Sequence, residues 1–397
     1  MKENVIIIIG GGVSGITTAL TLQLLGFDTT VIAEHLVDDE APDDPRFASL
    51  YPAASVIPHS VQSSRLASLF TDSLVIFKHL FEEEFEHVDK HRHFELFEFP
   101  RTLPDYTRHL HNFSPIDKCR DEPIPRRTDA PKLHGWVFDC FVAEWPDYMQ
   151  QLYTLYRQSG GTIRREKIER NQISTLPADV IINCSGIWSV DLFSDATEQQ
   201  IVRGHLVHAL NMKAVSNKAG LPCSYNYTPR KEVYATPQNK SSDVYFYPIK
   251  NRWVLGGSRQ IGSLDGKGNW SGDTHHRNIH IGDVDVPRPV IELNKNILQN
   301  TFGVHLKSGN HLKAQVGYRH SRGNKEHGLR LEKDVAHRKT IIHNYGHGGA
   351  GVTLSWGCAL QVLRLLADDD IRGKIRGAQK SPVLKSLQVK LQKVYLN

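Results

Sequence analysis

The sequence lacks any hydrophobic run of the ~18–20 residues that a membrane-spanning helix needs. It has few cysteines, five in all, and no C-x-x-C pair. An odd number of scattered cysteines excludes a disulfide framework and a zinc ribbon, and favours reduced thiols in a cytosolic setting. Charged residues make up 23% of the chain and hydrophobic residues 40%, which excludes a disordered chain and a collagen-like fibre.

An excess of positive charge is found only at the C-terminus. The net charge is +5, and residues 373–397 hold six Lys or Arg and no Asp or Glu. Removing those six charges leaves −1 for the other residues. The chain outside the tail therefore lacks the excess of positive charge that is typical of a nucleic-acid-binding protein. The chain has 397 residues, enough for two or three domains of ~100–200 residues each.

The start of the chain has the pattern of a βαβ unit. The β-branched run Val5–Ile9 predicts a strand buried on both faces, and it is too short for a signal peptide. Apolar residues at helical spacing over Ile16–Leu25 predict a helix, and Phe27–Ala33 predicts a second strand.

The glycines between the first strand and the helix predict a dinucleotide-binding turn. Gly10 permits a tight turn, Gly12 lets a pyrophosphate approach the backbone, and Gly15 lets the helix pack on the strand. Glu34 follows Gly15 by 19 residues and could accept both hydroxyls of a ribose. The alternative is a structural βα turn. A carboxylate at this position disfavours NADP, but the turn alone does not choose between FAD and NAD.

The rest of the chain predicts further helices and strands. We expect helices over 64–85, 145–158, 290–306 and 352–366, and strands over 93–99, 178–183 and 340–344. Short alternating segments at 232–235, 244–248 and 253–257 predict an antiparallel sheet. Residues 115–131 and 262–285 are expected to be irregular, because turn-forming residues are frequent there.

These elements predict an α/β fold, in which a Rossmann-like domain carries an inserted, mainly antiparallel α+β substrate domain. We assign residues 1–60, 150–205 and 312–372 to the discontinuous nucleotide-binding domain, 61–149 and 206–311 to the substrate domain, and 373–397 to a basic tail. Apolar residues recur in the tail at helical spacing, which predicts a helix docked on its own domain. A membrane-surface or partner-binding helix is the alternative.

A second glycine-rich segment lies near the C-terminus. Ile341–Gly351 reads as a strand and a glycine turn, and the helix that follows would stabilise negative charge at its start, as on a reduced flavin. This segment resembles, along its whole length, the signature of the D-amino acid oxidase family. Further resemblances run from residue 5 to about 365, in Ala53-Ala54, Asn183–Trp188, Arg203-Gly204-His205 (His where the family has Gln) and Gly317–Arg322.

The resemblance implies FAD as the cofactor and a D-amino acid oxidase-like fold. The residues that it assigns to FAD lie in the two glycine turns and in the segments between them. They are Gly10, Gly12, Val13, Ser14, Gly15, Glu34, Ala53, Ala54, Ile168, Ser185, Gly186, Gly348, Gly349, Ala350, Gly351, Val352 and Thr353.

The resemblance also assigns a substrate site. Arg319 would hold the α-carboxylate with a bidentate fork, and Tyr245 would donate a second hydrogen bond to it, so both are candidate catalytic residues. Ile57-Pro58-His59 and Gly256–Gln260 are similar to the D-aspartate oxidase branch, in which His59 and Arg259 would line a pocket for an acidic side chain. The alternatives are a surface ion pair for Arg319, a core aromatic for Tyr245, a structural ion pair for Arg259 and a merely hydrogen-bonded His59.

We therefore expect FAD-dependent oxidative deamination of a D-amino acid, D-aspartate-like in its side chain, giving a 2-oxo acid, ammonia and hydrogen peroxide. Neutral D-amino acids or a specialised amine are alternative substrates, and a quinone is an alternative to oxygen. The alternative of another class is a non-catalytic flavin-binding interaction protein. The lid tyrosine of neutral D-amino acid oxidases would fall near Ser241 and is absent, and we expect the extra length in 76–135 and 260–290.

A histidine-rich stretch and the C-terminal residues carry two further expectations. His275, His276 and His280 with Asp273 lie in a Gly/Asn/Asp-rich stretch, where we expect a loop and no metal site. The last residues are Tyr-Leu-Asn and not the Ser-Lys-Leu type of peroxisomal address. Together with the lack of a signal peptide, this leads us to expect a cytoplasmic protein whose partners are a small-molecule substrate and oxygen, with no nucleic acid or membrane.

Overall fold

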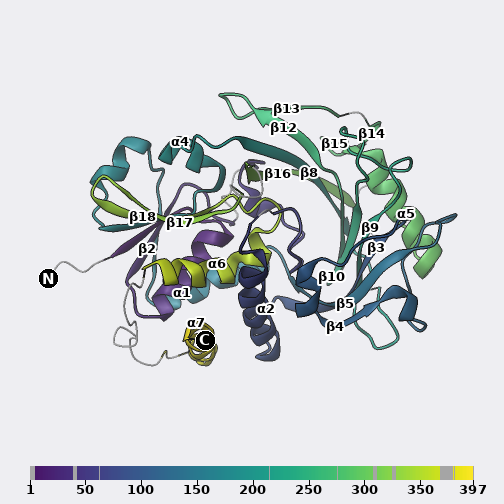
Figure 1. Ribbon diagram of the computed structural model, residues 1–397, viewed down its shortest axis with the longest axis horizontal. Coiled ribbons are helices and arrows are strands. Elements are labelled where there is room, and N and C mark those ends of the chain that lie inside the picture. Colours follow the sequence, from purple (N-terminus) through teal and green to yellow (C-terminus); the bar gives the residue numbers. More distant parts are fainter. Residues whose placement is uncertain are drawn as a thin grey trace. The chain divides into compact units, whose positions relative to one another are not determined.

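The computed structural model describes residues 5–38, 43–61, 63–213, 215–274, 276–306, 311–323, 328–366, 379 and 381–396 (Figure 1). The chain divides into two compact units. The first contains residues 1–89, 143–200 and 320–397, and the second contains residues 90–142 and 201–319. Each unit is built around its own sheet.

The first unit contains a mostly parallel sheet. Its six strands have the order β17-β18-β7-β1-β2-β6, and only β17 runs antiparallel to its neighbour. The four isoleucines of β1 are all buried, as expected for a parallel strand covered on both faces. The strands are β1 (Ile6–Ile9), β2 (Thr29–Ala33), β6 (Thr162–Arg165), β7 (Val180–Asn183), β17 (Arg330–Ala336) and β18 (Lys339–Tyr345).

Helices cover this sheet, with α1 and α6 on one side and α4 on the other (Figure 1). The two helices α1 and α6 pack against each other, and α2 packs closely on α6 because Gly357 leaves room for the backbone of Leu69. A Cβ at Gly357 would lie 2.0 Å from the Leu69 carbonyl oxygen. The helices are α1 (Val13–Leu24), α2 (Leu66–Glu82), α3 (Asp147–Gln158), α4 (Ser189–Phe193), α6 (Gly351–Leu366) and α7 (Pro382–Leu396).

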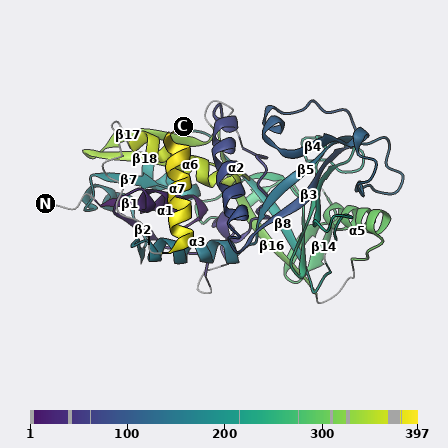
Figure 2. The same cartoon turned by 90° about the horizontal axis from the view of Figure 1, so that it is seen from below.

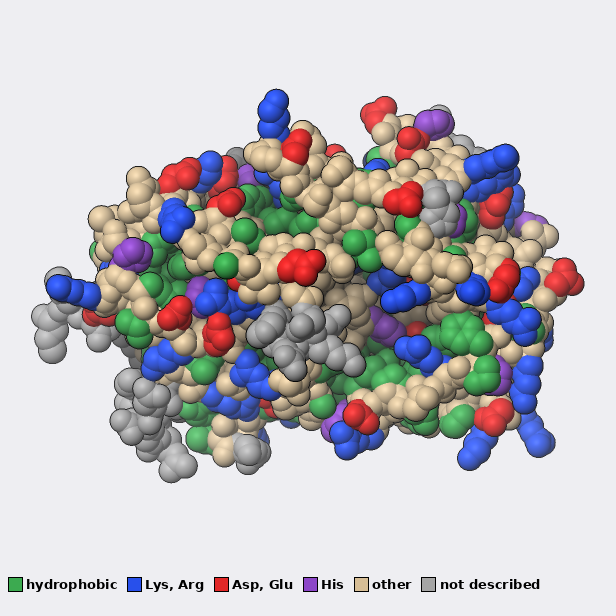
Figure 3. Space-filling view, turned by 45° about the horizontal axis from the view of Figure 1, so that its top comes forward, with side chains coloured by type: hydrophobic (Ala, Val, Ile, Leu, Met, Phe, Trp, Pro, Cys, Tyr) green, Lys and Arg blue, Asp and Glu red, His purple; other side chains and the backbone are tan. Residues whose placement is uncertain are grey.

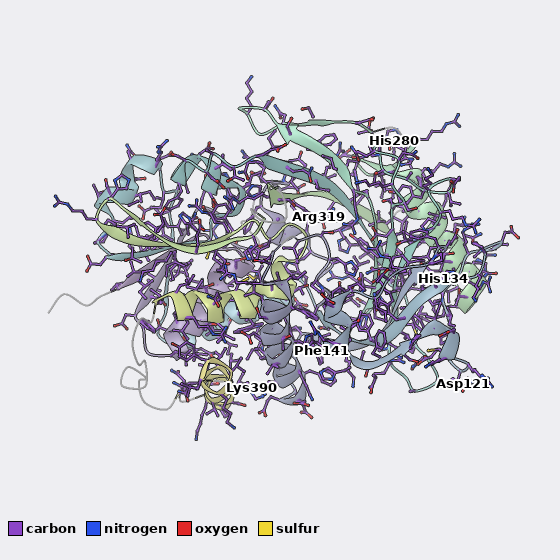
Figure 4. The ribbon with its side chains drawn as sticks, viewed as in Figure 1. Asp121, His134, Phe141, His280, Arg319 and Lys390 are labelled. Carbon is purple, nitrogen blue, oxygen red and sulfur yellow. The ribbon has the colours of Figure 1, made fainter. Side chains whose placement is uncertain are left out.

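The C-terminal helix α7 lies against α1, α2 and α6 (Figure 2). Its apolar side chains Leu384, Leu387 and Leu391 are buried, and Lys390 (labelled in Figure 4) is on the same helix. This arrangement agrees with the docked helix expected for the tail, of which residues 373–378, 380 and 397 lie outside the described part of the chain. No helix in the described part of the chain is long and apolar enough to cross a membrane.

The second unit contains a ten-stranded sheet with the order β13-β12-β8-β11-β10-β9-β3-β5-β4, and β16 pairs with β8. A separate hairpin and one helix complete the unit. The elements are β3 (Val88–Phe97), β4 (His111–Pro115), β5 (His134–Ala143), β8 (Gln199–Leu210), β9 (Cys223–Thr228), β10 (Val244–Ile249), β11 (Arg252–Gly256), β12 (Gln260–Leu264), β13 (Trp270–Gly272), β14 (Asn278–Ile281), β15 (Val284–Pro287), α5 (Arg288–Phe302) and β16 (Leu312–Arg322).

The two faces of this sheet differ in polarity. Phe94, Tyr225 and Phe246 belong to one hydrophobic cluster with Ile297 and Leu298 of α5, so this face of the sheet is apolar. Because side chains alternate along a strand, the intervening residues lie on the opposite face. That face carries His93, Glu95, Ser224, Asn226, Tyr245 and Tyr247.

The expected fold class is confirmed, with a Rossmann-like sheet and a mainly antiparallel second unit. The bounds of the units differ from those we expected, because α2 packs on α6 and so lies in the first unit with residues 61–89. The loop expected over 262–285 is wrong, since β13, β14 and β15 lie there. Their exposed, turn-rich hairpins lack the apolar alternation that identifies a strand. The strand expected at 232–235 is also wrong, because only Ala235 forms an isolated bridge.

Acidic and basic side chains are interspersed over the face that Figure 3 draws. This mixture agrees with the charge balance of the sequence, in which the basic residues exceed the acidic ones by only five.

Candidate active site

The first glycine turn of the first unit joins β1 to α1. Gly10 has a φ of 115°, and a Cβ there would lie 2.3 Å from the Cys184 carbonyl oxygen. A Cβ at Gly15 would lie 1.9 Å from the Gly10 carbonyl oxygen. A side chain at Gly10 would therefore clash with the segment after β7, and one at Gly15 would push α1 away from the turn. Close packing at both positions is what a dinucleotide-binding turn requires.

The helix α1 begins directly after this turn. Gly12 is the N-cap residue and has no side chain with which to cap the helix. The Val13 N–H donates to Ser49 Oγ at 3.1 Å, and Ser14 Oγ lies 3.4 Å from His347 Nδ1. Burial lowers the pKa of His347 to about 4, so its ring is neutral at pH 7. The partial positive charge at this helix end is suited to a pyrophosphate.

Glu34 follows β2, at the same edge of the sheet as the glycine turn, and its side chain is 44% exposed. It can therefore accept hydrogen bonds from a ribose. Next to it, His35 lies between two aromatic rings, with centroids 5.8 Å from Phe47 and 5.7 Å from Trp188. The Arg46 guanidinium is 5.7 Å from the Trp188 ring. Sequence reasoning did not identify this aromatic cluster, because its members come from three separate segments.

The other residues expected near the dinucleotide also lie in the first unit. Ile168 is buried in a cluster with Ile9 and Ile32, beside the strands that carry the turn. Ser185 Oγ donates to Asn183 Oδ1 at 2.6 Å, which holds the turn after β7. A Cβ at Gly186 would meet no atom within 4 Å, so this residue borders open space.

The second glycine turn is tied to the segment that contains Ala53 and Ala54. The Gly349 N–H donates to the Ser60 carbonyl oxygen at 3.0 Å. Thr353 Oγ1 donates to the Ser55 and Ile57 carbonyl oxygens at 3.1 and 3.0 Å. Two segments about 300 residues apart in sequence are thus brought together, as expected for a shared cofactor site.

These hydrogen bonds also hold the neighbouring residues of the segment from Ala54 to His59. Ala54 has a φ of 59°, which is rare for a residue with a side chain. His59 is half-buried at the end of the bridged segment, with its N–H donating to Ile57 O at 2.9 Å. Of the remaining turn residues, Ala350, Val352 and Thr353 are buried, and Gly351 begins α6. The starts of α1 and α6 at the two glycine turns fit an elongated dinucleotide such as FAD.

In the second unit, Arg319 lies on β16 (labelled in Figure 4) and faces a glycine. A Cβ at Gly204 would lie 2.4 Å from Arg319 Nη1, so only glycine leaves room for the guanidinium. Nη1 donates to the Ser258 carbonyl oxygen at 3.2 Å, which fixes one edge of the fork. Burial lowers the pKa of Arg319 from its ordinary value, and the neighbouring Tyr245 opposes this change.

Tyr245 packs against a second glycine, Gly256. It is directly opposite Gly256 in the pairing of β10 and β11, and a Cβ at Gly256 would lie 2.2 Å from the tyrosine hydroxyl. Burial raises the pKa of Tyr245, while the positive charge of Arg319 lowers it. The hydroxyl therefore stays protonated next to a cation, and the two side chains together can bind a carboxylate.

Arg259 forms a two-point ion pair within the same unit. Its Nε donates to Asp243 Oδ1 at 2.7 Å and its Nη2 to Asp243 Oδ2 at 3.0 Å. The charge of Asp243 raises the pKa of Arg259. This pairing favours the structural ion pair that we kept as the alternative for Arg259. Sequence reasoning did not identify Asp243, because nothing in a sequence marks a residue 16 positions away as an ion-pair partner.

His205 fixes Ser258 on the other side of Arg319. The His205 backbone N–H donates to Ser258 Oγ at 2.7 Å, and His205 Nδ1 is also 2.7 Å from that oxygen. Burial and the charges of Arg203 and Arg319 lower the pKa of His205 to about 3, so the ring is neutral. In the position where the family has Gln, a neutral His thus serves as a hydrogen-bonding side chain.

The histidine-rich stretch shows no metal site in the part that the structure describes. His280 lies on β14 with Nδ1 2.5 Å from Asp285 Oδ1, and His276 Nε2 lies 2.7 Å from the Ala235 carbonyl oxygen. His275 is outside the described residues. Among the described residues, no group of three or more His, Cys, Asp or Glu side chains is placed to hold a metal ion.

Known proteins resemble this chain over most of its length. The profile of a family described as FAD dependent oxidoreductase (DAO) matches residues 6–365. The D-amino-acid oxidase of Rubrobacter xylanophilus is 27% identical over 363 residues, which cover 90% of this chain and 94% of that protein. Human D-aspartate oxidase is 24% identical over 379 residues, covering 91% and 94%. A crystal structure of glycine oxidase from Geobacillus kaustophilus shares the fold, with a TM-score of 0.62, 16% identity and coverage of 92% and 95%.

Proposed function

The chain belongs to the DAO family of FAD-dependent oxidoreductases, and from this premise we propose that it oxidises D-amino acids at the carbon that bears the amine. The observation that carries the proposal is the Arg319–Tyr245 pair. The Arg319 guanidinium lies over Gly204 and the Tyr245 hydroxyl lies over Gly256. A larger residue in place of either glycine would displace the group above it. This arrangement supports the binding of one carboxylate, the group that all α-amino acids share.

The first unit would hold the FAD. Gly10, Gly12 and Ser14 surround the helix end suited to the pyrophosphate, and Glu34 is placed to accept ribose hydroxyls. The second glycine turn, Gly348–Thr353, offers the start of α6 to a negatively charged ring. When bound, FAD accepts a hydride from the substrate Cα and so supplies the oxidising chemistry.

The task of the protein is then to orient the substrate. Arg319 and Tyr245 would hold the α-carboxylate at two points, which fixes where Cα and its hydrogen lie. Because the hydrogen leaves with its electron pair, no side chain has to remove a proton from Cα, and the amine only has to be neutral. The imine that forms is hydrolysed by water to a 2-oxo acid and ammonia, and oxygen as the final acceptor yields hydrogen peroxide.

The choice of D over L substrates and of oxygen as acceptor is supported by the relatives. Two curated relatives that each match about nine tenths of the chain are by name oxidases of D-amino acids or of D-aspartate. A quinone-reducing dehydrogenase remains the alternative within the class. It would reduce its FAD with the same substrates but form no peroxide.

The narrower prediction of an acidic side chain depends on Arg259 and His59. The ion pair with Asp243 opposes this prediction, because Arg259 already has a carboxylate partner and a second one would add a buried negative charge. We therefore propose D-amino acid oxidation as the activity, with an acidic side chain as one of the preferences to be tested.

The proposal is tested by measuring the 2-oxo acid, ammonia and hydrogen peroxide formed from D-alanine, D-aspartate and D-lysine and from their L-enantiomers. We expect all three products in equal amounts from at least one D-amino acid, and none from the L-forms. If FAD is bound but no amino acid yields product or reduces it, the non-catalytic flavin-binding protein is the correct interpretation.

A further inference from the structure

The sheet of the second unit has a bulge where β8 passes from one neighbouring strand to the next. β8 pairs with β11 through Leu206 and Gly256, and with β12 through Arg203 and Gln260. The two residues of β8 between these pairs therefore lie opposite three residues of the segment that joins β11 to β12. A bulge of this kind interrupts the regular hydrogen bonds of the sheet and re-aims the groups within it.

Ser258 is the middle residue of those three, and it is only 1% exposed. The His205 backbone N–H donates to Ser258 Oγ at 2.7 Å, where a regular antiparallel pair would offer a carbonyl oxygen. The Ser258 carbonyl oxygen instead accepts a hydrogen bond from Arg319 Nη1 at 3.2 Å. The bulge thus lets one residue bind β8 with its side chain and the guanidinium with its main chain.

The ring of His205 completes the hydrogen bonds of Ser258 Oγ, since Nδ1 lies 2.7 Å from that oxygen. The oxygen already accepts the backbone N–H, so its own hydrogen is available for Nδ1 to accept. If Nδ1 donated instead, the buried hydroxyl hydrogen would have no acceptor among the described residues, which is costly. The hydrogen-bond network therefore assigns a neutral ring with its hydrogen on Nε2. Burial and the charges of Arg203 and Arg319 lower the pKa of His205 to about 3, in agreement with a neutral ring.

Gly204 and His205 act on the guanidinium from consecutive positions of β8. Gly204 leaves the space that the guanidinium occupies, because a Cβ there would lie 2.4 Å from Nη1. Successive side chains of a strand point to opposite faces, so the ring of His205 points away from the face on which Gly204 meets Arg319. His205 therefore acts on Arg319 through Ser258 and not by contact with a ligand of the guanidinium.

A fixed guanidinium matters for the binding of a carboxylate. Two-point binding needs two N–H groups that are aligned with both carboxylate oxygens. The bond from Nη1 to Ser258 fixes one edge of the guanidinium and so sets the direction of its other N–H groups. A guanidinium that is free to turn would lose part of its binding free energy when the carboxylate orders it.

We propose that His205 is a positioning residue for substrate binding, which holds Ser258 so that Arg319 presents a fixed edge to the substrate carboxylate. This inference rests on the proposed function, since it takes Arg319 as the residue that binds the carboxylate. It gives the histidine a role in KM and none in the transfer of the hydride.

The test measures kcat and KM for the D-amino acid that the wild type oxidises fastest, with propionate as a competitive inhibitor. Propionate has a carboxylate and no amine, so its inhibition constant reports on the carboxylate site alone. In His205→Leu we expect KM and the inhibition constant to rise together, about three- to tenfold, because one buried hydrogen bond is lost. The change in kcat should be smaller than the change in KM.

Two further variants locate the effect in the bond between His205 and Ser258. His205→Asn should keep both constants near the wild-type values, because the Asn Oδ1 atom can accept the Ser258 hydroxyl as Nδ1 does. Ser258→Ala keeps the carbonyl oxygen that binds Arg319 but loses the hydroxyl, and it should raise both constants as His205→Leu does. The double variant should be no worse than either single one, since both remove the same bond.

The matched control is Asn294→Leu. Asn294 is a fully buried residue of α5 in the same unit, and its Oδ1 accepts the Tyr225 hydroxyl at 2.7 Å. This variant also removes a buried hydrogen bond, but it does so in the hydrophobic cluster and away from Ser258. It should lower the melting temperature and leave both constants unchanged.

Three results would overturn the inference: wild-type constants in His205→Leu, an equal rise in His205→Asn, or a KM that rises while the inhibition constant for propionate does not. If the wild type oxidises a D-amino acid, each of these leaves the proposed function standing, whereas no oxidation of any D-amino acid would end both. If His205→Leu does not fold, Ser258→Ala decides, and wild-type constants in that variant contradict the inference.

Discussion

Gly204 lies directly against the guanidinium of Arg319. A Cβ at Gly204 would be 2.4 Å from Nη1 and 2.6 Å from Nη2, closer than any real contact. In Gly204→Ala the guanidinium must therefore move, and with it the carboxylate of the substrate. We expect KM for a D-amino acid to rise about tenfold or more, measured by steady-state kinetics of peroxide formation.

The matched control for this variant is Gly266→Ala. Gly266 lies in an exposed turn of the same unit, and a Cβ there would meet no atom within 4 Å. Its kinetics and its melting temperature should equal those of the wild type. Unchanged KM in Gly204→Ala, with FAD bound and the fold intact, would mean that Arg319 does not hold the substrate.

The two-point binding of the carboxylate predicts a graded response to substitution. Arg319→Lys keeps the charge but loses the planar fork, and we expect kcat/KM to fall about 30-fold or more, corresponding to about 2–5 kcal/mol. Tyr245→Phe loses a single hydrogen bond to a charged group, so a fall of about 10- to 100-fold is expected. Equal kcat/KM for Arg319→Lys and wild type would contradict the assignment.

The role of Glu34 is tested by FAD affinity and not by activity. In Glu34→Gln one hydrogen-bond acceptor for the ribose becomes neutral, and we expect the dissociation constant for FAD to rise about tenfold. Titration of the apoprotein with FAD, followed by quenching of flavin fluorescence, gives this constant. Glu86→Gln, at an exposed carboxylate of the same unit, is the control and should bind FAD as the wild type does.

Buried neutral histidines make the stability depend on pH. Burial lowers the pKa from 6.5 to about 3 for His205 and to about 4 for His208, His320, His343 and His347. Between pH 6.5 and about 4, the unfolded chain binds protons at these rings and the folded protein does not. The free energy of unfolding therefore falls as the pH falls through this window, by up to about 1.4 kcal/mol per pH unit for each ring.

Calorimetry at several pH values measures this slope. His343→Gln should be less sensitive to acid than the wild type, because one of the rings that titrates only after unfolding has been removed. His305→Gln, at an exposed position, should keep the wild-type slope. A melting temperature that is constant from pH 6.5 to 4.5 would contradict the low pKa values.

The elements that the sequence predicted well have strong local patterns. The first strand, helix and second strand were expected within a few residues of β1, α1 and β2, because four consecutive isoleucines and three spaced glycines leave few alternatives. The alternation over 93–99 likewise identified β3. It did not show that Glu95 would be paired with Asn226, because the residues of one strand do not determine which distant strand it pairs with.

Other features depend on tertiary contacts that carry no local signal. The α2 helix was expected in the substrate domain, yet it packs on α6 through Gly357, nearly 300 residues later in the chain. The ion pair of Arg259 with Asp243 joins the segment between β11 and β12 to the residue before β10. This pair changes the interpretation of Arg259, because a guanidinium whose charge is already balanced by a carboxylate gains less from binding a second carboxylate.

On the function proposed above, this chain binds a D-amino acid by its carboxylate and oxidises it with FAD. The most direct measurement is the absorbance of the bound flavin after anaerobic mixing with D-lysine, D-alanine and D-aspartate, each beside its L-enantiomer. We predict rapid loss of the oxidised flavin bands with at least one of the D-amino acids and with none of the L-enantiomers, and slow or no loss in Arg319→Lys. Oxidised flavin that persists with every D-amino acid would contradict the account.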